Sequence, residues 1–253
     1  MSDLSAASAL PPALAALDPR PALTHCAWIL ADEGHESGLA GQLTARGPQP
    51  GTLWTLPLGL AFDEATPQAW LLIDLELNVL AGDGAFGVRE PNPATRFHVW
   101  VYRARADVHA IVHTHPSAAS ALGAAEQPLV IAHMDATPLF DDTTFLAQWP
   151  GLPTADREGE LIAASLGDKH ALLLAHHGIL TAGRSVQEAA FLAVFMERMA
   201  RLQLDARAAG GARPVDAIEA KRARDFLRTD RIMNLTFDAW ARAAQRRRAV
   251  AGR

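Results

Sequence analysis

Two apolar runs that each end in histidines constrain the fold of this chain more than any other feature. They are Val-His-Ala-Ile-Val-His-Thr-His at 108–115 and Ala-Leu-Leu-Leu-Ala-His-His-Gly at 171–178. The first run alternates in the manner of a strand, and the second is a continuous apolar segment of the kind that a sheet buries on both faces. Segments with helical spacing lie at 116–124 and 157–167, so the sequence predicts an α/β fold.

The first hundred residues divide into an arm, a helix and a block of strands. Residues 1–20 are rich in Ala and Pro and have little periodicity, which predicts a mobile arm. Residues 24–32 fit a helix that Gly34 ends. Residues 43–80 alternate short apolar runs with turn residues, which predicts adjacent antiparallel strands. A further helix is expected over 92–106, because asparagine followed by proline resembles a helix start.

The second half adds one more expected strand and a long helix. Residues 129–135, Leu-Val-Ile-Ala-His-Met-Asp, predict a strand, so that strands and helices would alternate in this half. Ser185 and Glu188 have the spacing of a capping box in front of a long amphipathic stretch. The Arg-rich tail from Val215 onward is helical in composition and is expected to be peripheral.

Composition excludes several classes of function. The net charge of −5 disfavours a nucleic-acid partner, because such proteins concentrate Lys and Arg on one face. The single cysteine, Cys26, excludes an intramolecular disulfide and fits a reducing compartment. The N-terminal segment lacks a basic start and a long apolar run, so we expect no signal peptide, no membrane span and a cytoplasmic location.

The histidines at the ends of the two runs have the spacing of a metal site. Successive side chains of a strand alternate between its faces, so His113 and His115 project together. A catalytic metal site needs about three protein ligands and one open position, and His177 beside Gly178 can supply the third. The alternative is that these are half-buried strand histidines satisfied by backbone groups.

At this point the chain resembles a known family, the class II aldolases and adducins. The resemblance lies in RFHVWVYRARADVHAIVHTHPSAASAL and GDKHALLLAHHGILTAGRSVQEAAFLAVFMER and extends over roughly residues 25–205. It implies a three-layer α/β/α sandwich with a central mixed, largely antiparallel sheet, and a homotetramer with active sites at subunit interfaces. It also implies a divalent metal held by His113, His115 and His177. The domains expected are an arm at 1–20, the family domain at 21–210 and a helical tail at 211–253.

The chain departs from the sugar-phosphate aldolases of that family at two places. Their Ser-Ser-Glu, which supplies phosphate contacts and an acid/base glutamate, is replaced here by Asn92-Pro93-Ala94. Their phosphate loop carries Thr-Gly where this chain has Leu58-Gly59. Phosphate recognition requires several N–H or O–H donors and positive charge, so we expect a substrate without phosphate.

The acid/base group must then come from elsewhere. His35 and Glu36 lie in a polar, glycine-flanked loop that can supply it, although a solvated surface loop is the alternative. His176 is the other candidate, but on a strand it would face away from His177 and serve as a core or supporting residue.

Substrate-binding residues are expected among the arginines, because a guanidinium matches a carboxylate with two hydrogen bonds. Arg46, Arg89 and Arg96 are the candidates, together with the amides of Gln42 and Asn92. The expected substrate is a small oxo- or hydroxy-carboxylate.

The metal and the reaction follow from these expectations. Zn is the expected ion, with Mn and Fe as alternatives, because imidazole suits all three. A metal-stabilised enolate is common to decarboxylation and aldol cleavage, so we expect a carbon–carbon lyase. The alternatives are an Fe(II)-dependent oxygenase that performs oxidative decarboxylation and a non-catalytic adducin-like interaction module. Retention of all three histidines argues against the module.

Overall fold

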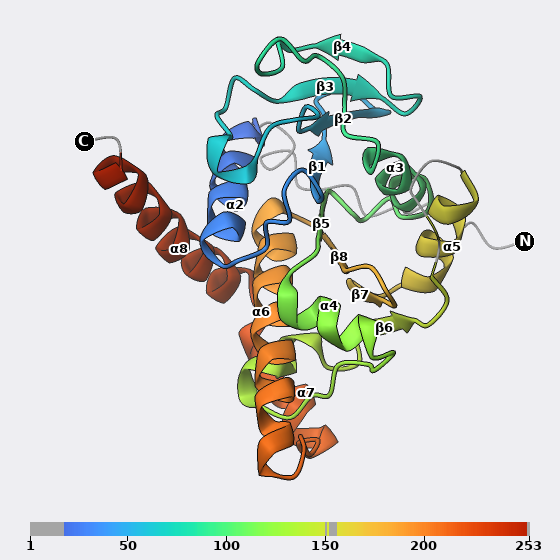
Figure 1. The fold of residues 1–253 in the computed structure, drawn as a ribbon, viewed down its shortest axis with the longest axis vertical. Coiled ribbons are helices and arrows are strands. Elements are labelled where there is room, and N and C mark those ends of the chain that lie inside the picture. Colours follow the sequence, from blue (N-terminus) through green and yellow to red (C-terminus); the bar gives the residue numbers. More distant parts are fainter. Residues whose placement is uncertain (1–17, 150, 152–155, 252–253) are drawn as a thin grey trace, which may run out of the picture.

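The computed structural model describes residues 18–149, 151 and 156–251, whose strands form one eight-stranded sheet in the order β4-β3-β2-β1-β5-β8-β7-β6. The helices and strands, in chain order, are α2 (Arg20–Asp32), β1 (Gln42–Arg46), β2 (Thr52–Thr55), β3 (Leu71–Asp74), β4 (Val79–Ala81), α3 (Thr95–Ala104), β5 (Ala110–Thr114), α4 (Ser117–Ala124), β6 (Thr143–Leu146), α5 (Asp156–Leu166), β7 (Ala171–Leu174), β8 (Ile179–Gly183), α6 (Val186–Ala206), α7 (Ala217–Leu227) and α8 (Asp230–Ala251). Figure 1 shows β5 near the middle of the sheet. The arm predicted for 1–20 lies outside the described residues up to residue 17.

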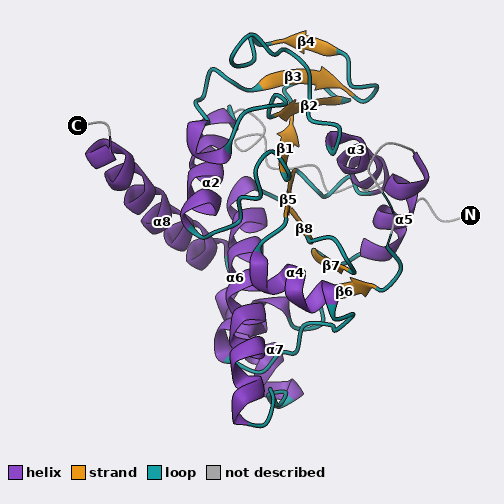
Figure 2. Cartoon of the chain, in the orientation of Figure 1, coloured by secondary structure: helices purple, strands orange, loops and turns teal. Residues whose placement is uncertain are grey.

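Helices cover both faces of this sheet (Figure 2). Helices α2, α4 and α6 lie on one face, with α8 packed outside α2 and α6, and α3 and α5 lie on the other. Among the described strands β6 and β7 pair in parallel, whereas the other neighbours are antiparallel. The predicted three-layer α/β/α sandwich with a mixed, largely antiparallel sheet is confirmed.

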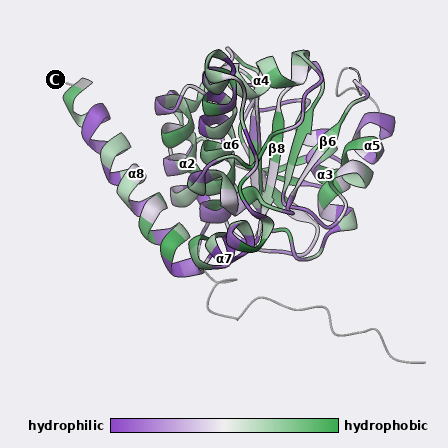
Figure 3. Ribbon diagram, turned by 90° about the horizontal axis from the view of Figure 1, so that it is seen from below, coloured by the Kyte–Doolittle hydropathy of each residue, from purple (hydrophilic) through white to green (hydrophobic). Residues whose placement is uncertain are grey.

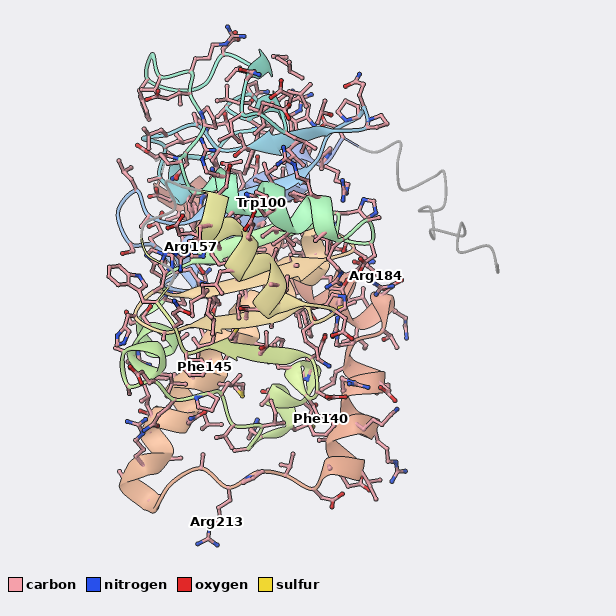
Figure 4. All side chains as sticks on the ribbon, turned by 90° about the vertical axis from the view of Figure 1, so that its right-hand side faces the viewer. Trp100, Phe140, Phe145, Arg157, Arg184 and Arg213 are labelled. Atoms are coloured by element: carbon pink, nitrogen blue, oxygen red, sulfur yellow. The ribbon has the colours of Figure 1, made fainter. Side chains whose placement is uncertain are left out.

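Each face of the sheet has its own apolar core, and the strands β5, β7 and β8 between the two cores are buried along their whole length (Figure 3). On β5, Val112 packs with α2 and α6, while its neighbour Ile111 packs with α3 and α5. Trp100 of α3 lies against α5 at Gly159, where an added Cβ would be 2.1 Å from its Cδ1 atom (Figure 4). The continuous apolar run at 171–178 is explained by this double burial.

Two expectations for the second half were wrong. Residues 129–133 form no strand and lead into a 3₁₀ helix, Met134–Leu139, because Val130 N donates to a side chain and Ile131 O accepts from Val215 N, and neither bonds to a neighbouring strand. The Gln203 amide of α6 accepts from Val130 N at 2.7 Å and donates to Pro128 O at 3.1 Å. Strands β7 and β8 also form a hairpin, so strands and helices do not alternate here.

The C-terminal tail is not peripheral. Met233, Phe237 and Ala244 of α8 are buried in the core that α2 and α6 share. Arg247 and Asp32 add an ion pair between α8 and α2, with 2.7 Å between nitrogen and oxygen. No helix in the described ranges is both long and apolar enough to cross a membrane. The domain boundaries at 20 and 210 stay predictions.

Candidate metal centre

Three histidines meet where β5 ends and the β7–β8 turn passes it. His113 lies on β5, His115 follows the last residue of that strand, and His177 lies in the turn. Their ring centroids are 4.7–4.8 Å apart for all three pairs. One candidate ligand nitrogen from each ring lies within 4.8 Å of the others. The structure thus brings together the three residues that the sequence singled out.

The turn that carries His177 requires a glycine beside it. Gly178 packs so closely on β5 that an added Cβ would lie 2.3 Å from Thr114 O and 2.6 Å from His115 Cδ2. The turn is closed by a hydrogen bond of 2.9 Å from Leu174 N to Gly178 O. The absence of a side chain at 178 therefore lets His177 approach the end of β5.

The orientation of His113 is fixed by its neighbours. Its Nδ1 is 2.8 Å from Ile179 O, and because a carbonyl only accepts, Nδ1 carries the proton and Nε2 keeps its lone pair. Phe97 packs edge-on against the ring at 4.8 Å between centroids. The Nε2 atom of His115 lies 3.0 Å from that of His113. Both nitrogens are thereby directed to one point.

The electrostatics of the three rings fit a divalent cation. Burial lowers the pKa of His113, His115 and His177, the last to about 4, so all three are neutral at pH 7. His177 Nδ1 is buried and has no hydrogen-bond partner among the described residues. Metal–nitrogen bonds of about 2.0–2.1 Å separate neighbouring ligand nitrogens by about 3.3 Å, which is within the reach of these rings. Neutral imidazoles of this arrangement suit Zn, Mn or Fe.

Gln42 lies beside the triad, but its amide is engaged inside the core. It pairs in register with His113 and is fully buried. Its Nε2 donates to Thr55 Oγ1 at 3.0 Å and to Thr95 Oγ1 at 2.9 Å. This amide therefore supports the sheet and α3, and is not available to a substrate in this geometry.

Asn92 lies near the triad, and its side chain bonds both to the loop before β1 and to the start of α3. Its Nδ2 donates to Leu39 O at 3.1 Å and to Gly41 O at 3.3 Å, and its Oδ1 accepts from Ala94 N. Asn92 therefore connects the start of α3 to the loop that enters β1. That loop touches the site, because a Cβ on Gly41 would lie 3.2 Å from His113 O.

The arginines expected to clamp a carboxylate are not placed with the histidines. Arg46 is at the opposite end of β1 from Gln42, about 13 Å away at the usual strand rise. Its guanidinium donates to the carbonyls that end α3 and precede β5, those of Tyr102, Arg105 and Val108. Arg96 forms an exposed ion pair with Asp156, and Arg89 donates to Gly82 O. This placement argues against the clamp.

The two candidate acid/base residues of the loop Gly34-His35-Glu36-Ser37 lie in different surroundings. His35 is fully buried, and its Nδ1 is 2.9 Å from Thr114 Oγ1, on the opposite face of β5 from His113. Burial lowers the pKa of His35 to about 3. Glu36 is exposed and accepts from Asp63 N at 3.3 Å. Among the described residues, no hydrogen bond joins either of them to a ring of the triad.

His176 is not on a strand, contrary to expectation. It lies in the β7–β8 turn with a left-handed φ of 54°, and its ring is turned to the surface. Its Nε2 is 3.1 Å from Glu126 Oε1. The alternation of a strand, on which the expectation for this residue rested, therefore does not apply to it, and its ring contacts Glu126 at the surface.

Sequence reasoning did not identify Phe97 or Glu197 as parts of this region. Phe97 contacts the ring of His113, and the Glu197 carboxylate accepts from the backbone N–H groups of Ala118 and Ala119, just after His115. A signal for Glu197 was present, because it is a lone acidic residue in the apolar stretch Ala-Phe-Leu-Ala-Val-Phe-Met-Glu-Arg-Met.

Comparisons with known proteins agree with this geometry. A family model described as "Class II Aldolase and Adducin N-terminal domain" matches residues 22–204. The chain is 33% identical to a 4-hydroxy-3-prenylphenylpyruvate oxygenase/4-hydroxy-3-prenylbenzoate synthase of Streptomyces roseochromogenus subsp. oscitans, over 79% of this chain and 70% of that protein. It is 31% identical to a 3,4-dihydroxyphthalate decarboxylase of Arthrobacter keyseri, over 76% and 80%. The solved structure of an L-fuculose 1-phosphate aldolase from Glaciozyma antarctica PI12 superposes with a TM-score of 0.83 at 28% identity, covering 91% and 90% of the two chains.

Proposed function

Because the chain belongs to the class II aldolase and adducin family, we propose that it is a carbon–carbon lyase whose divalent ion is held by His113, His115 and His177. The observation that carries the proposal is the convergence of three neutral imidazoles, one with its tautomer set by Ile179 O. A bound divalent ion supplies Lewis acidity, which stabilises negative charge on an oxygen next to the bond that breaks. The protein holds the three rings in place and keeps one nitrogen of each ring deprotonated.

Three segments near His113 are joined to one another by hydrogen bonds. The segments, which we call the site wall, are 37–41, 57–59 and 90–92. Leu58 N donates to Glu90 O at 2.9 Å, and Asn92 Nδ2 donates to Leu39 O at 3.1 Å. Gly41 completes the connection by packing on His113 O. The wall is therefore attached to the backbone of His113.

The composition of the site wall favours a substrate without phosphate. Its residues include no Lys or Arg, one hydroxyl from Ser37 and one carboxylate from Glu90. The side chain of Leu39 is 54% exposed and adds apolar surface. A phosphate dianion would lack cationic partners here to offset the loss of its hydration. A less charged, partly apolar molecule loses little hydration free energy when it binds. We propose a small oxo- or hydroxy-carboxylate with an aromatic group, which agrees with the names of the two relatives.

A homotetramer with active sites between subunits is part of this proposal. His115 and His177 remain partly exposed. Because these two ligand candidates face the surface in part, a neighbouring subunit can complete the pocket over the triad. Sedimentation at micromolar concentration tests the assembly, and a protein that stays monomeric would contradict it.

An Fe(II)-dependent oxygenase is the second candidate function. It is favoured by the name of the Streptomyces relative, an oxygenase, and by the ability of three imidazoles to bind Fe as well as Zn. Oxygen uptake distinguishes the two. Turnover under argon with Zn or Mn supports the lyase, whereas strict dependence on Fe(II) and dioxygen supports the oxygenase.

Sugar phosphates are expected to be poor substrates of the metal-loaded protein. The acid/base glutamate of the sugar-phosphate enzymes is replaced at 92–94, and a missing general acid or base lowers the rate about 10²- to 10⁴-fold. We therefore expect kcat/KM for L-fuculose 1-phosphate at least about 10²-fold below that for the best unphosphorylated aromatic hydroxy-carboxylate. The assay follows both substrate classes side by side over one metal series.

A variant of the site wall provides the control for this assay. Leu58→Thr introduces a hydroxyl where the wall has an apolar side chain, and it is expected to lower the KM for the sugar phosphate without improving turnover of the carboxylate. Efficient cleavage of the sugar phosphate by the unmodified protein would contradict our account of the wall.

A further inference from the structure

Helix α4 begins immediately after the ligand candidate His115, and its first N–H groups are satisfied from a distant helix. Pro116 occupies the N-cap position and has no side-chain acceptor to offer. Instead, Glu197 of α6 accepts from Ala118 N at 2.9 Å and from Ala119 N at 2.8 Å, one bond to each carboxylate oxygen. One side chain of α6 therefore holds the N-terminus of α4.

The same helix touches the turn that carries the third histidine. Ser120 Oγ donates to His177 O at 3.4 Å, and His176 N donates to Gly123 O at 3.2 Å. Gly123 packs so closely on β7 that an added Cβ would lie 2.7 Å from Leu174 O. Helix α4 therefore connects the chain after His115 to the turn that contains His177.

Glu197 is a buried carboxylate, so its desolvation must be offset by specific interactions. The residue is 8% exposed and sits in the apolar contact between α6 and α4, where an uncharged side chain would pack without a desolvation cost. Arg201 is its nearest cation, at 4.0 Å from Oε1, and is itself half exposed. The two charge-assisted bonds to α4 are therefore the interactions that offset the burial of this carboxylate.

We propose that Glu197 is a positioning residue of the metal centre, which sets the separation of His115 and His177 by fixing the N-terminus of α4. This inference rests on the proposed function, because it requires a divalent ion at the triad. Mutation of a side chain that orients a metal ligand typically lowers the metal affinity about 10- to 100-fold. Glu197 does not bond to a ligand histidine itself and acts on the site through the backbone of α4.

The experiment measures the Zn²⁺ dissociation constant by competition with a chromophoric chelator. Glu197→Ala is expected to raise the constant at least about 10-fold. Glu197→Gln keeps the volume and one acceptor oxygen, so it should fold normally and give an intermediate increase. In Co²⁺-loaded protein, the ligand-field absorption bands of both variants should shift, because the arrangement of the nitrogens around the ion changes.

Asp216→Ala is the matched control. Asp216 accepts from Ile218 N and Glu219 N at the start of α7, so this variant also removes a carboxylate that receives two helix N–H bonds. It is expected to leave the Zn²⁺ dissociation constant and the Co²⁺ spectrum unchanged.

The possible outcomes separate the inference from the proposed function. If the unmodified protein binds Zn²⁺ and both Glu197 variants bind it equally well, Glu197 is a helix cap alone and the inference is overturned while the proposed function stands. If the unmodified protein binds no divalent ion, both are overturned. If Asp216→Ala weakens metal binding as much as Glu197→Gln, the effect is one of general stability and the inference is again overturned.

Discussion

Replacement of His113 by alanine is expected to remove the bound divalent ion and to lower kcat/KM at least about 10³-fold, since a Lewis-acid ion contributes several kcal/mol to transition-state stabilisation. His113 is the most constrained of the three rings, being buried, bonded to Ile179 O and packed against Phe97. Elemental analysis after dialysis and steady-state kinetics with the best carboxylate substrate measure the two effects.

His25→Ala is the control for this experiment. His25 lies on α2, where its Nε2 is 2.8 Å from Gln245 Nε2, and it is separate from the triad. This variant also removes one imidazole, but it should retain the ion and full turnover. Retention of one equivalent of metal and normal kinetics by His113→Ala would rule out the triad as the metal site.

Arg228→Met is expected to lower the free energy of unfolding by about 3–5 kcal/mol, the usual effect of removing one partner from a buried ion pair. Arg228 lies between α7 and α8 and bonds to Asp142 and to Glu188, with 2.6 Å to Glu188 Oε1. Burial lowers its pKa to about 10, so it stays charged at pH 7. Without it, two buried carboxylates lose their shared cation, and α7 and α8 lose a polar attachment to the sheet and α6.

Thermal and urea unfolding measure this loss. A change of that size lowers Tm by roughly 6–20 °C in a protein of this length. Arg222→Met is the matched control, because Arg222 is also on α7 but forms an exposed pair with Glu219, for which at most about 0.5 kcal/mol is expected. Equal stability losses in the two variants would show that the Arg228 network adds nothing beyond a surface ion pair.

Local periodicity predicted much of the fold. The run at 108–115 indicated a strand, and β5 covers Ala110–Thr114. Ser185 caps α6 as predicted by accepting from Glu188 N, although the Glu188 carboxylate bonds to Arg184 N and not to Ser185 N. These features depend on residues two to four positions apart, which is the range over which helix and strand geometry act.

Tertiary pairing decided what periodicity could not. The segment at 129–133 has the composition of a strand but bonds to Gln203, which lies some seventy residues further along the chain. Arg46 has the charge expected of a carboxylate clamp, but the register of β1 places it at the end of the strand opposite to His113. Both outcomes depend on partners distant in sequence, whose positions no local pattern specifies.

The sequence by itself determined that His113 and His115 share a face, because the two-residue period of a strand is a local property of the backbone. Only the tertiary structure decided how His177 joins them, since the β7–β8 hairpin, the close packing at Gly178 and the contacts of α4 act between segments tens of residues apart. It also decided that Glu197 faces α4 and not solvent. The physical reason is that side-chain direction follows from local geometry, whereas the meeting of side chains from different segments follows from packing and hydrogen bonding of the whole fold.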